Sequence, residues 1–570
     1  MTHRQILFII FGLMAGMFLS SLDQTIVGTS MRTIADDLHG LDAQAWVTTA
    51  YLIASTVTTP IYGKLSDIFG RRPLFIIAIA IFLIGSLAAG FATSMYQLAG
   101  FRALQGLGAG GLMALPLAIM GDILVPRERA KYQGYFLAVF ATSSVIGPLV
   151  GGLFAGTNWI LGITGWRWVF LVNLPIGIVA LAIVLRFLHI PHTRHSVRID
   201  WWGAGTVVLA LVPLLLVAEQ GREWGWDSPG AIACYVIGVL GIAAFIISEK
   251  LMGDDALIPL KLFRNATFSM ATVLGVLIGF GMFGAMMTIP LYLQLVNGAT
   301  PTESGFLMLP MIVGLMISSI VSGQIIARTG IYKWFPRIGT GLLAAGYIWL
   351  TFATADKPVT YMMVGMLLIG LGLGQLMQTL TIASQNSVGP RDIGVATSSS
   401  TFFRQIGGTL GVAILFSVLY TRIPDTIAAA FARPTNVANL QAAMQDKAVT
   451  GDPANAGILS LLSSAQGGDT SAVGESLNGD SSFLTGADGR LTAPFLQGFN
   501  DATVTVYWVA LVVVLVAFVL SWFLKTSPLR DKSALQENAE AAIQAQTAAE
   551  QTGALVEPGV ATGNIPRQKA

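Results

Sequence analysis

Long apolar segments recur along this chain and restrict its fold more than any other feature. Crossing about 30 Å of hydrocarbon takes roughly 20 apolar residues in a helix, whose backbone polar groups need no water. Only 11% of the residues are charged, and 54% are hydrophobic. We therefore expect an all-α integral membrane protein with fourteen transmembrane helices, over residues 6–29, 45–62, 74–93, 98–120, 133–155, 168–188, 201–218, 230–249, 267–293, 304–326, 336–354, 358–380, 395–420 and 502–525.

The first apolar segment is expected to remain in the protein. It begins at Ile6, continues past the usual length of a signal peptide, and is followed by no Ala-x-Ala site.

Basic residues fall in alternate connections between the predicted helices, which sets the orientation under the positive-inside rule. We expect both termini in the cytoplasm and the chain in the cytoplasmic (inner) membrane. The inner connections would then hold Lys64, Arg71, Arg72, Arg127, Arg129, Lys131, Arg194, Arg198, Lys250, Lys261, Arg264, Arg328, Lys333, Arg337 and Arg391, and the outer ones Asp36, Asp37, Asp42, Glu223, Asp227, Glu303 and Asp356.

Two polar segments lie outside the predicted helices. Residues 422–500 are rich in Ala, Gly, Ser, Asn and Asp, and we expect a partly disordered outer loop with short helices near 436–447 and 456–465. The tail from 529 to 570 is expected to be a frayed helix that passes into disorder.

Several functional classes find no support in the composition. A net charge of +2 gives no reason to expect a nucleic-acid partner, and the single cysteine, Cys234, permits neither an internal disulfide nor a cysteine metal cluster. No nucleophile elbow or phosphate loop is present, so we expect no catalytic residue, metal or cofactor. The histidines form no zinc-protease pattern; they are His3, His39, His189, His192 and His195.

An internal repeat relates the two halves of the chain. The stretch Gly106-Leu-Gly-Ala-Gly-Gly-Leu-Met113 recurs as Gly370-Leu-Gly-Leu-Gly-Gln-Leu-Met377, and the pair Gly63 and Gly70 is echoed by Gly323 and Gly330. Two homologous halves are the economical explanation. Transporters built from such repeats bind their substrate between the halves, near the middle of the membrane.

Five motifs occur in order along the first half. They are Leu22-Asp-Gln-Thr-Ile-Val27, Gly63-Lys-Leu-Ser-Asp-Ile-Phe-Gly-Arg-Arg72, Arg102-Ala-Leu-Gln-Gly-Leu-Gly-Ala-Gly110, Gly147-Pro-Leu-Val-Gly-Gly152 and Trp166-Arg-Trp-Val-Phe-Leu-Val-Asn-Leu-Pro-Ile-Gly177. Together they resemble the fourteen-helix drug:proton antiporter branch of the major facilitator superfamily, with Ser143 in place of a usual glycine.

The resemblance implies a domain plan and an activity. The plan is a six-helix half at 1–190, an inserted helix pair at 191–260, a second six-helix half at 261–528, and a cytoplasmic tail at 529–570. The activity would be export of lipophilic or cationic drugs by alternating access, driven by the proton motive force without a cofactor. The partners would be a lipophilic substrate, protons and the bilayer, around a monomer.

Asp23 and Arg102 are the candidates for proton coupling, because ionisable groups at membrane depth are costly. Counting about 1.5 Å per residue places both at a similar depth, so they can meet if their helices are adjacent. Two alternatives stay open: Asp23 as a structural acid, and Arg102 as an anchor between helices.

The loop motif supplies candidates for a cytoplasmic latch, as the resemblance implies: Gly63, Asp67, Gly70, Arg71 and Arg72. The glycines permit close approach, and Asp67 at a helix end can interact with a helix dipole. Topogenic positive charge alone explains the arginines but neither the glycines nor Asp67. In the second half Ala327 stands in the acidic position, so we expect an asymmetric latch.

Pro148 removes one backbone hydrogen bond from the fifth predicted helix, which favours a bend for gating. Glycine packing without gating is the alternative. The residues assigned to this kink are Gly134, Gly147, Pro148, Gly151 and Gly152.

Polar residues that could line the cavity are Asn173, Gln294, Gln375, Gln378 and Arg404. Arg404 lies near the middle of its predicted helix and could bind an anionic group or offset polarity inside the protein.

Two other functions remain open. One is export of a lipid or amphipathic metabolite through the same cavity. The other is a membrane sensor or scaffold that acts through its outer loop without transport.

Overall fold

The chain forms a bundle of long helices, shown by a computed structural model that describes residues 3–39, 44–189, 198–466, 484, 486–530, 532–533, 536–537, 540 and 543–544. The domain boundary near 190, His192, His195, the middle of the 422–500 segment and most of the tail lie outside the described residues. The long helices are α1 (His3–Asp37), α2 (Gln44–Phe69), α3 (Arg71–Gly90), α4 (Met95–Ile123), α5 (Pro126–Ala155), α7 (Asn173–Phe187), α8 (Trp201–Trp224), α9 (Pro229–Met252), α10 (Ala266–Leu295), α12 (Leu309–Thr329), α13 (Trp334–Thr351), α14 (Val359–Asn386), α15 (Ile393–Phe431) and α20 (Gly489–Ser521).

Twelve helices in the described part are long and apolar enough to cross a membrane. The two predicted segments outside this set, 45–62 and 336–354, are helical as α2 and α13 and pack against spanning neighbours, but the count of fourteen crossings stays a prediction. Two predicted helices are interrupted, because short α6 (Trp168–Leu171) precedes α7 and α11 (Pro301–Leu307) precedes α12. A two-stranded hairpin, β1 (Trp159–Ile160) with β2 (Ile163–Thr164), joins α5 to α6.

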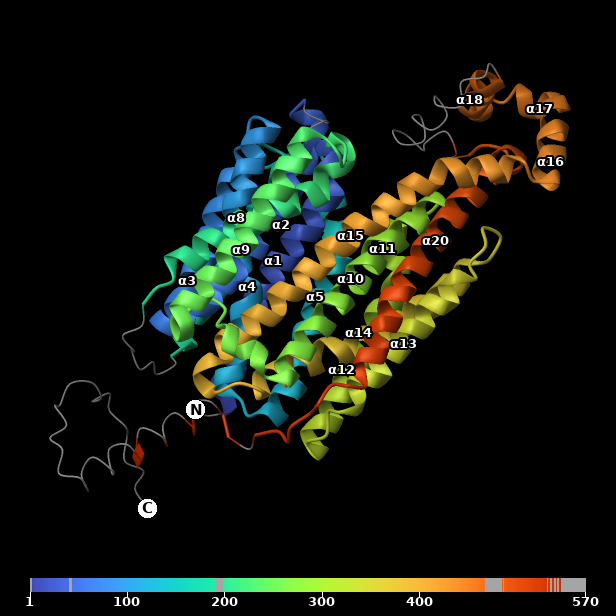
Figure 1. The fold of residues 1–570 in the computed structure, drawn as a ribbon. Coiled ribbons are helices and arrows are strands. Elements are labelled where there is room, and N and C mark those ends of the chain that lie inside the picture. The colour runs from blue at the N-terminus through green and yellow to red at the C-terminus, as the bar shows by residue number, and fades with distance from the viewer. Residues whose placement is uncertain are drawn as a thin grey trace, which may run out of the picture.

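The helices lie side by side, with the N-terminus and the described end of the tail at one end of the bundle (Figure 1). The buried apolar side chains form separate clusters. Two clusters draw on residues between Ile9 and Leu188, and the largest draws on residues between Ala271 and Leu529. Each half of the repeat therefore has an apolar core of its own.

The outer segment is more helical than the composition predicts. Helix α15 continues to Phe431 instead of ending near 420, and α20 begins at Gly489 instead of near 502. The reason is an apolar stripe on each extension: Ile423 and Ile427 are buried against α20, and a side-chain atom on Gly498 would meet Ile427. The prediction of a loop over all of 422–500 was therefore wrong at both ends.

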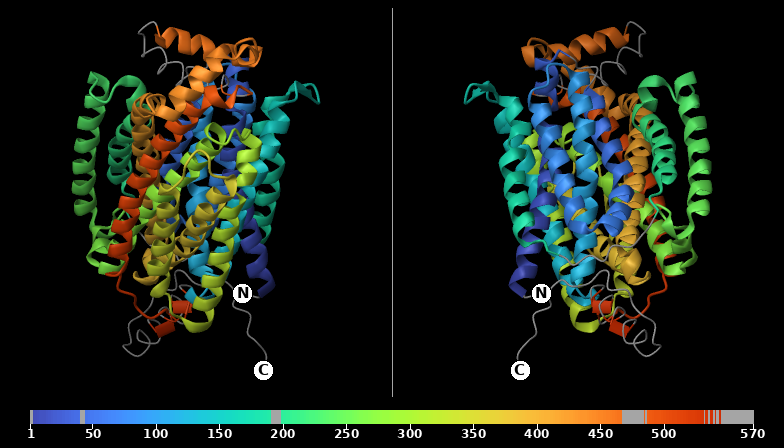
Figure 2. Two further views of the ribbon diagram at one scale, coloured as in Figure 1. Left: turned by 90° about the vertical axis from the view of Figure 1, so that its right-hand side faces the viewer. Right: turned by 90° about the vertical axis from the view of Figure 1, so that its left-hand side faces the viewer.

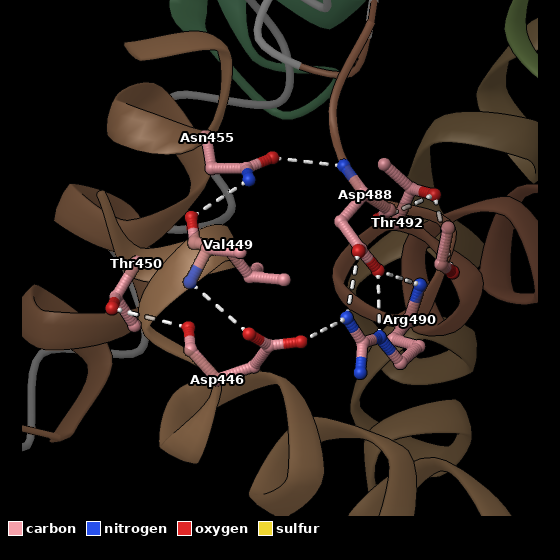
Figure 3. Close-up of polar contacts among 9 residues, drawn as sticks. Asp446, Val449, Thr450, Asn455, Asp488, Arg490 and Thr492 are labelled. Carbon is pink, nitrogen blue, oxygen red and sulfur yellow. Dashed lines mark hydrogen bonds and ion pairs between the residues drawn. The ribbon is translucent and has the colours of Figure 1, made fainter. Parts of the chain in front are cut away.

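The expected short helices are present as α16 (Pro434–Gln445) and α18 (Ala456–Gln466), with α17 (Lys447–Thr450) between them. They lie beyond the end of the bundle opposite the N-terminus (Figures 1 and 2). Arg490, at the start of α20, pairs with Asp446 at 3.1 Å and with Asp488 at 3.0 Å (Figure 3). Asn455 accepts a hydrogen bond from the Asp488 backbone N–H, so α20 holds this group of helices in place.

The helix pair α8 and α9 lies at the edge of the bundle (Figure 2). It covers the line along which α2 meets α15, because Val207 of α8 packs with Ile61 of α2 and Phe402 of α15. The end of this pair that lies toward the N-terminal end of the bundle is held by a buried carboxylate. Asp200 accepts hydrogen bonds from the backbone N–H groups of Gly203 and Leu257.

Candidate functional site

The centre of the first half holds a buried ion pair between Asp23 of α1 and Arg102 of α4. Arg102 Nη1 donates to Asp23 Oδ2, and both side chains are at most 2% exposed. Gln105, one turn along α4, donates to Asp23 Oδ1 at 2.8 Å and accepts from Arg102 at 2.7 Å. Asp23 and Arg102 therefore meet, as their similar depth in the membrane allowed.

Asn173 belongs to this cluster and not to a cavity wall. It is fully buried at the start of α7, and its amide donates to Asp23 Oδ1 at 2.7 Å and to Ser86 Oγ of α3 at 2.9 Å. Its predicted place among cavity-lining residues was wrong, because spacing along a helix does not tell which neighbour a side chain faces. Asp23 thus receives three side-chain donors from two other helices.

Tyr51 of α2 completes the cluster. The Arg102 guanidinium lies 4.0 Å from the centre of its ring, and its hydroxyl pairs with Ser20 of α1 at 2.9 Å. A buried ion pair contributes little net stability, but removing one partner leaves an unpaired charge, which costs about 3–5 kcal/mol. The cluster therefore makes the arrangement of α1, α2, α4 and α7 depend on both charges being present.

A second polar cluster joins the two halves at the end of the bundle that carries the N-terminus. Asp67 of α2 accepts a hydrogen bond at 3.0 Å from the backbone N–H of Val395, in the first turn of α15. A carboxylate at this place meets the positive end of the helix dipole. A side-chain atom on Gly63 would lie 1.9 Å from Ser398 Oγ, so α2 and α15 touch only because residue 63 is glycine.

Arg71 organises this cluster. Its guanidinium pairs with Asp67 and with Asp122 of α4, at 2.6 Å in each case. Burial raises the pKa of the Asp67 carboxyl to about 6, because desolvation outweighs the attraction of Arg71. Gly70 has φ 96°, a conformation that favours glycine. Arg72 points elsewhere and donates to the Leu185 carbonyl of α7 at 2.7 Å.

The corresponding segment of the second half, in which Ala327 takes the acidic position, also contacts the other half. Gly330 also has a positive φ, 72°, and lies close to the side chain of Arg127 at the start of α5. A further hydrogen bond joins the two halves at this end of the bundle, because Arg129 of α5 donates to Gln385 of α14 at 3.2 Å. The two halves are therefore closed against each other at this end.

The glycines of α5 have unequal surroundings. Side-chain atoms on Gly147 and Gly151 would lie 2.0 and 2.3 Å from the hydroxyls of Thr25 and Thr29 of α1, so both positions need glycine. Gly134 lies near Ile320 of α12. Gly152 is exposed with nothing within 4 Å, so close packing does not account for it. Pro148, inside α5, lies beside Gly305 of α11.

The other polar residues assigned to the cavity are scattered. Gln294 donates to Ser304 Oγ at 3.0 Å, Gln375 donates to the Leu371 carbonyl of its own helix at 3.3 Å, and buried Gln378 accepts from Ser319. Arg404 differs from all three. It is 9% exposed, and in the described part of the chain its side chain makes neither a hydrogen bond nor an ion pair.

Known proteins share the sequence as well as the architecture. The family model described as Major Facilitator Superfamily matches residues 13–412. This chain belongs to the major facilitator superfamily. It is similar to the Bacillus subtilis protein named multidrug transporter protein MdtP, with 40% identity over 417 residues that cover 73% of this chain and 75% of that protein.

Two further comparisons fit the same family. The Streptomyces rimosus tetracycline resistance determinant is 37% identical over 338 residues, which cover 59% of this chain and 94% of that protein. The solved structure of the major facilitator proton:xylose symporter XylE has a TM-score of 0.57 at 14% identity, covering 94% of this chain and 99% of that one. The chain is thus a multi-pass membrane protein with the major facilitator fold.

The sequence did not single out several residues of the two clusters. Gln105 was inside a quoted motif, three residues after Arg102, and that spacing places both on one helix face. Tyr51, Ser86 and Asp122 carried no comparable signal, because their partners lie on helices distant in the sequence.

Proposed function

We propose that this chain exports lipophilic small molecules across the cytoplasmic membrane in exchange for protons, with both termini in the cytoplasm. The observation that carries the proposal is the carboxylate of Asp23, buried at membrane depth and held by Arg102, Gln105 and Asn173. The names of the two relatives, a multidrug transporter and a tetracycline resistance determinant, support drugs as the exported class.

Proton binding at Asp23 would disturb its partners directly. Its Oδ2 atom accepts from Arg102, and its Oδ1 atom accepts from Gln105 and Asn173. A proton added to either oxygen competes with a donor already there, so uptake requires Arg102 or the two amides to withdraw. Because these donors sit on α4 and α7, proton binding is linked to a shift of those helices against α1.

The Asp67 cluster, at the end of the bundle that carries the N-terminus, would determine on which side of the membrane the transporter is closed. With Asp67 on Val395 and Arg129 on Gln385, the halves are joined at the proposed cytoplasmic end. Alternating access then requires these contacts to break before substrate enters from the cytoplasm. Coupling arises when loss of the proton from Asp23 favours one arrangement and its uptake favours the other.

Energised inverted membrane vesicles test the proposal. Addition of ethidium or tetracycline to vesicles that contain the chain should release part of the stored proton gradient, and Asp23→Asn should abolish that release. The matched control is Asp254→Asn, because Asp254 lies outside the bundle core and is 82% exposed. A substrate-dependent proton movement that persists in Asp23→Asn would refute the role of Asp23.

A second candidate, export of an amphipathic metabolite with an acidic group, is favoured by Arg404. This buried guanidinium lies on α15, about 16 Å from the start of the helix, with no compensating charge in the described residues. A buried cation without a partner is costly, and an anionic substrate group would offset that cost.

Paired compounds separate the two candidates. Transport of a lipophilic carboxylic acid and of its methyl ester should be compared in the intact chain and in Arg404→Gln. Loss of acid transport alone supports an anion site, whereas equal loss of both compounds assigns Arg404 a structural role.

A further inference from the structure

A basic cavity lies where the start of α13 meets the end of α20, away from both clusters described above. Its volume is about 460 Å³, within the range of roughly 300–1,000 Å³ that ligand sites occupy. It is lined by Lys333, Arg337, Trp522, Phe523, Leu524, Lys525 and Thr526. Three of these seven side chains are cationic, so the cavity is suited to an anion.

The guanidinium of Arg337 is fixed in place at this cavity. It lies 5.0 Å from the ring centre of Trp334 and 4.7 Å from that of Trp522, and it donates to the Trp522 carbonyl at 3.3 Å. Its Nε atom is enclosed and has no hydrogen-bond partner among the residues that the structure describes. An arginine held between two aromatic rings is pre-organised to bind an oxyanion.

Cations dominate the charged side chains around the cavity. Within the described ranges, no carboxylate forms an ion pair with Lys333, Arg337 or Lys525. The positive dipole end of α13, which begins at Trp334, and the negative dipole end of α20, which ends at Ser521, meet at this cavity and oppose each other. The three cationic side chains therefore supply its positive field, and they would stabilise an occupant with one or two negative charges.

Apolar side chains surround the cations and indicate a lipid in preference to a free ion. Trp334, Trp522 and Phe523 are 53%, 52% and 65% exposed, and Ile331 and Ile338 beside them are about half exposed. A basic pocket between helices at the cytoplasmic side, bordered by aromatic rings, has the features of a headgroup site. Acyl chains could lie along the exposed apolar surface while the phosphate enters the cavity.

We infer that this cavity binds the phosphate headgroup of an anionic phospholipid of the inner leaflet. The inner leaflet rests on the orientation proposed above, but neither α13 nor α20 contributes to the Asp23 or Asp67 cluster. Lys333, Arg337 and Lys525 contact the phosphate oxygens, and the two tryptophans hold the guanidinium of Arg337 in position.

Lipid binding to the purified full-length chain tests the inference. The chain is delipidated in detergent and titrated with phosphatidylglycerol, phosphatidylcholine or inorganic phosphate, and binding is followed by native mass spectrometry and by the unfolding temperature. We expect phosphatidylglycerol to bind and stabilise the chain. The triple variant Lys333→Gln, Arg337→Gln, Lys525→Gln should weaken that binding by about tenfold or more.

A second triple variant controls for general surface charge. Arg4→Gln, Lys131→Gln, Lys250→Gln removes three exposed cations from the same end of the bundle, on α1, α5 and α9, which do not pack closely against α13 or α20 in the described chain. Phosphatidylglycerol affinity should change by less than about twofold in this variant. If both triple variants weaken binding equally, or if inorganic phosphate stabilises the chain as much as the lipid does, the inference is wrong. Should the first triple variant not fold, the exposed single changes Lys333→Gln and Lys525→Gln give the same comparison.

Discussion

The carboxylate of Asp67 accepts the backbone N–H of Val395 at 3.0 Å, and this single bond joins the last turn of α2 to the first turn of α15. Val395 is buried, so its N–H has no water to replace the carboxylate. The bond therefore reports directly on whether the two halves are closed at this end.

Asp67→Ala should open the N-terminal end of the bundle. The change leaves the Val395 N–H without a partner, which costs about 1–3 kcal/mol in the closed state. In a chain with Cys234→Ala and Ser398→Cys, maleimide labelling of residue 398 should become faster. Asp392→Ala is the control, because Asp392 lies at the same helix end but pairs with Lys261. Equal acceleration by both changes would contradict the latch.

Closure at this end should also depend on pH. The pKa of Asp67 is about 6 when the halves are closed, against 3.8 for an ordinary aspartate, so the closed state holds its proton more tightly. This contribution to closure is full below about pH 4 and is lost as the pH rises through about 6. Labelling at residue 398 should therefore slow as the pH falls from 7 to 5. Asp67→Asn keeps a hydrogen-bond acceptor but cannot titrate. After each labelling rate is corrected for the pH dependence of thiol reactivity, this variant should label as fast at pH 5 as at pH 7.

Gly63→Ala should impair transport through a steric conflict. The added methyl group would lie 1.9 Å from Ser398 Oγ, which forces α2 away from α15 and disfavours closure by about 1–3 kcal/mol. Efflux of a fluorescent substrate from cells measures the loss. Gly205→Ala on α8, where nothing lies within 4 Å, should behave as wild type. Partial recovery in the double variant Gly63→Ala, Ser398→Gly would confirm that the conflict lies between these two residues.

The extension of α15 and α20 beyond the apolar core should depend on Gly498. A methyl group there would lie 2.3 Å from Ile427 Cγ1 and 2.6 Å from Ile427 Cα, so Gly498→Ala should separate the two helices. Tryptic cleavage after the exposed Arg422 would then become faster, because Ile423, the next residue, would no longer be buried against α20. Gly489→Ala has open space around it and provides the comparison. Unchanged cleavage in Gly498→Ala would show that the extensions are not held by this contact.

Sequence reasoning was most successful where a constraint acts along one helix. Apolar length located the helices, and the cost of charge at membrane depth singled out Asp23 and Arg102. The same reasoning misplaced Asn173, because residue type and depth do not reveal which neighbour a side chain meets. It also ended α15 near residue 420, since hydropathy falls there although Ile423 and Ile427 continue a buried stripe.

The choice between Arg71 and Arg72 could not be made from the sequence. Both follow Gly70, yet the chain reverses at that glycine so that Arg71 faces Asp67 and Asp122 while Arg72 faces α7. Consecutive residues of a helix point in directions about 100° apart. Which of the two arginines faces Asp67 therefore depends on how α3 is rotated about its axis, and packing sets that rotation.

The two halves meet along two lines, and α8 and α9 cover only one of these lines from the bilayer. Along the line where α2 meets α15, these two helices separate the bundle from surrounding lipid. Along the line where α5 meets α12, no other long helix of the described chain intervenes. The bundle therefore presents two different flanks to the bilayer, which gives this protein a front and a back that its internal repeat does not predict.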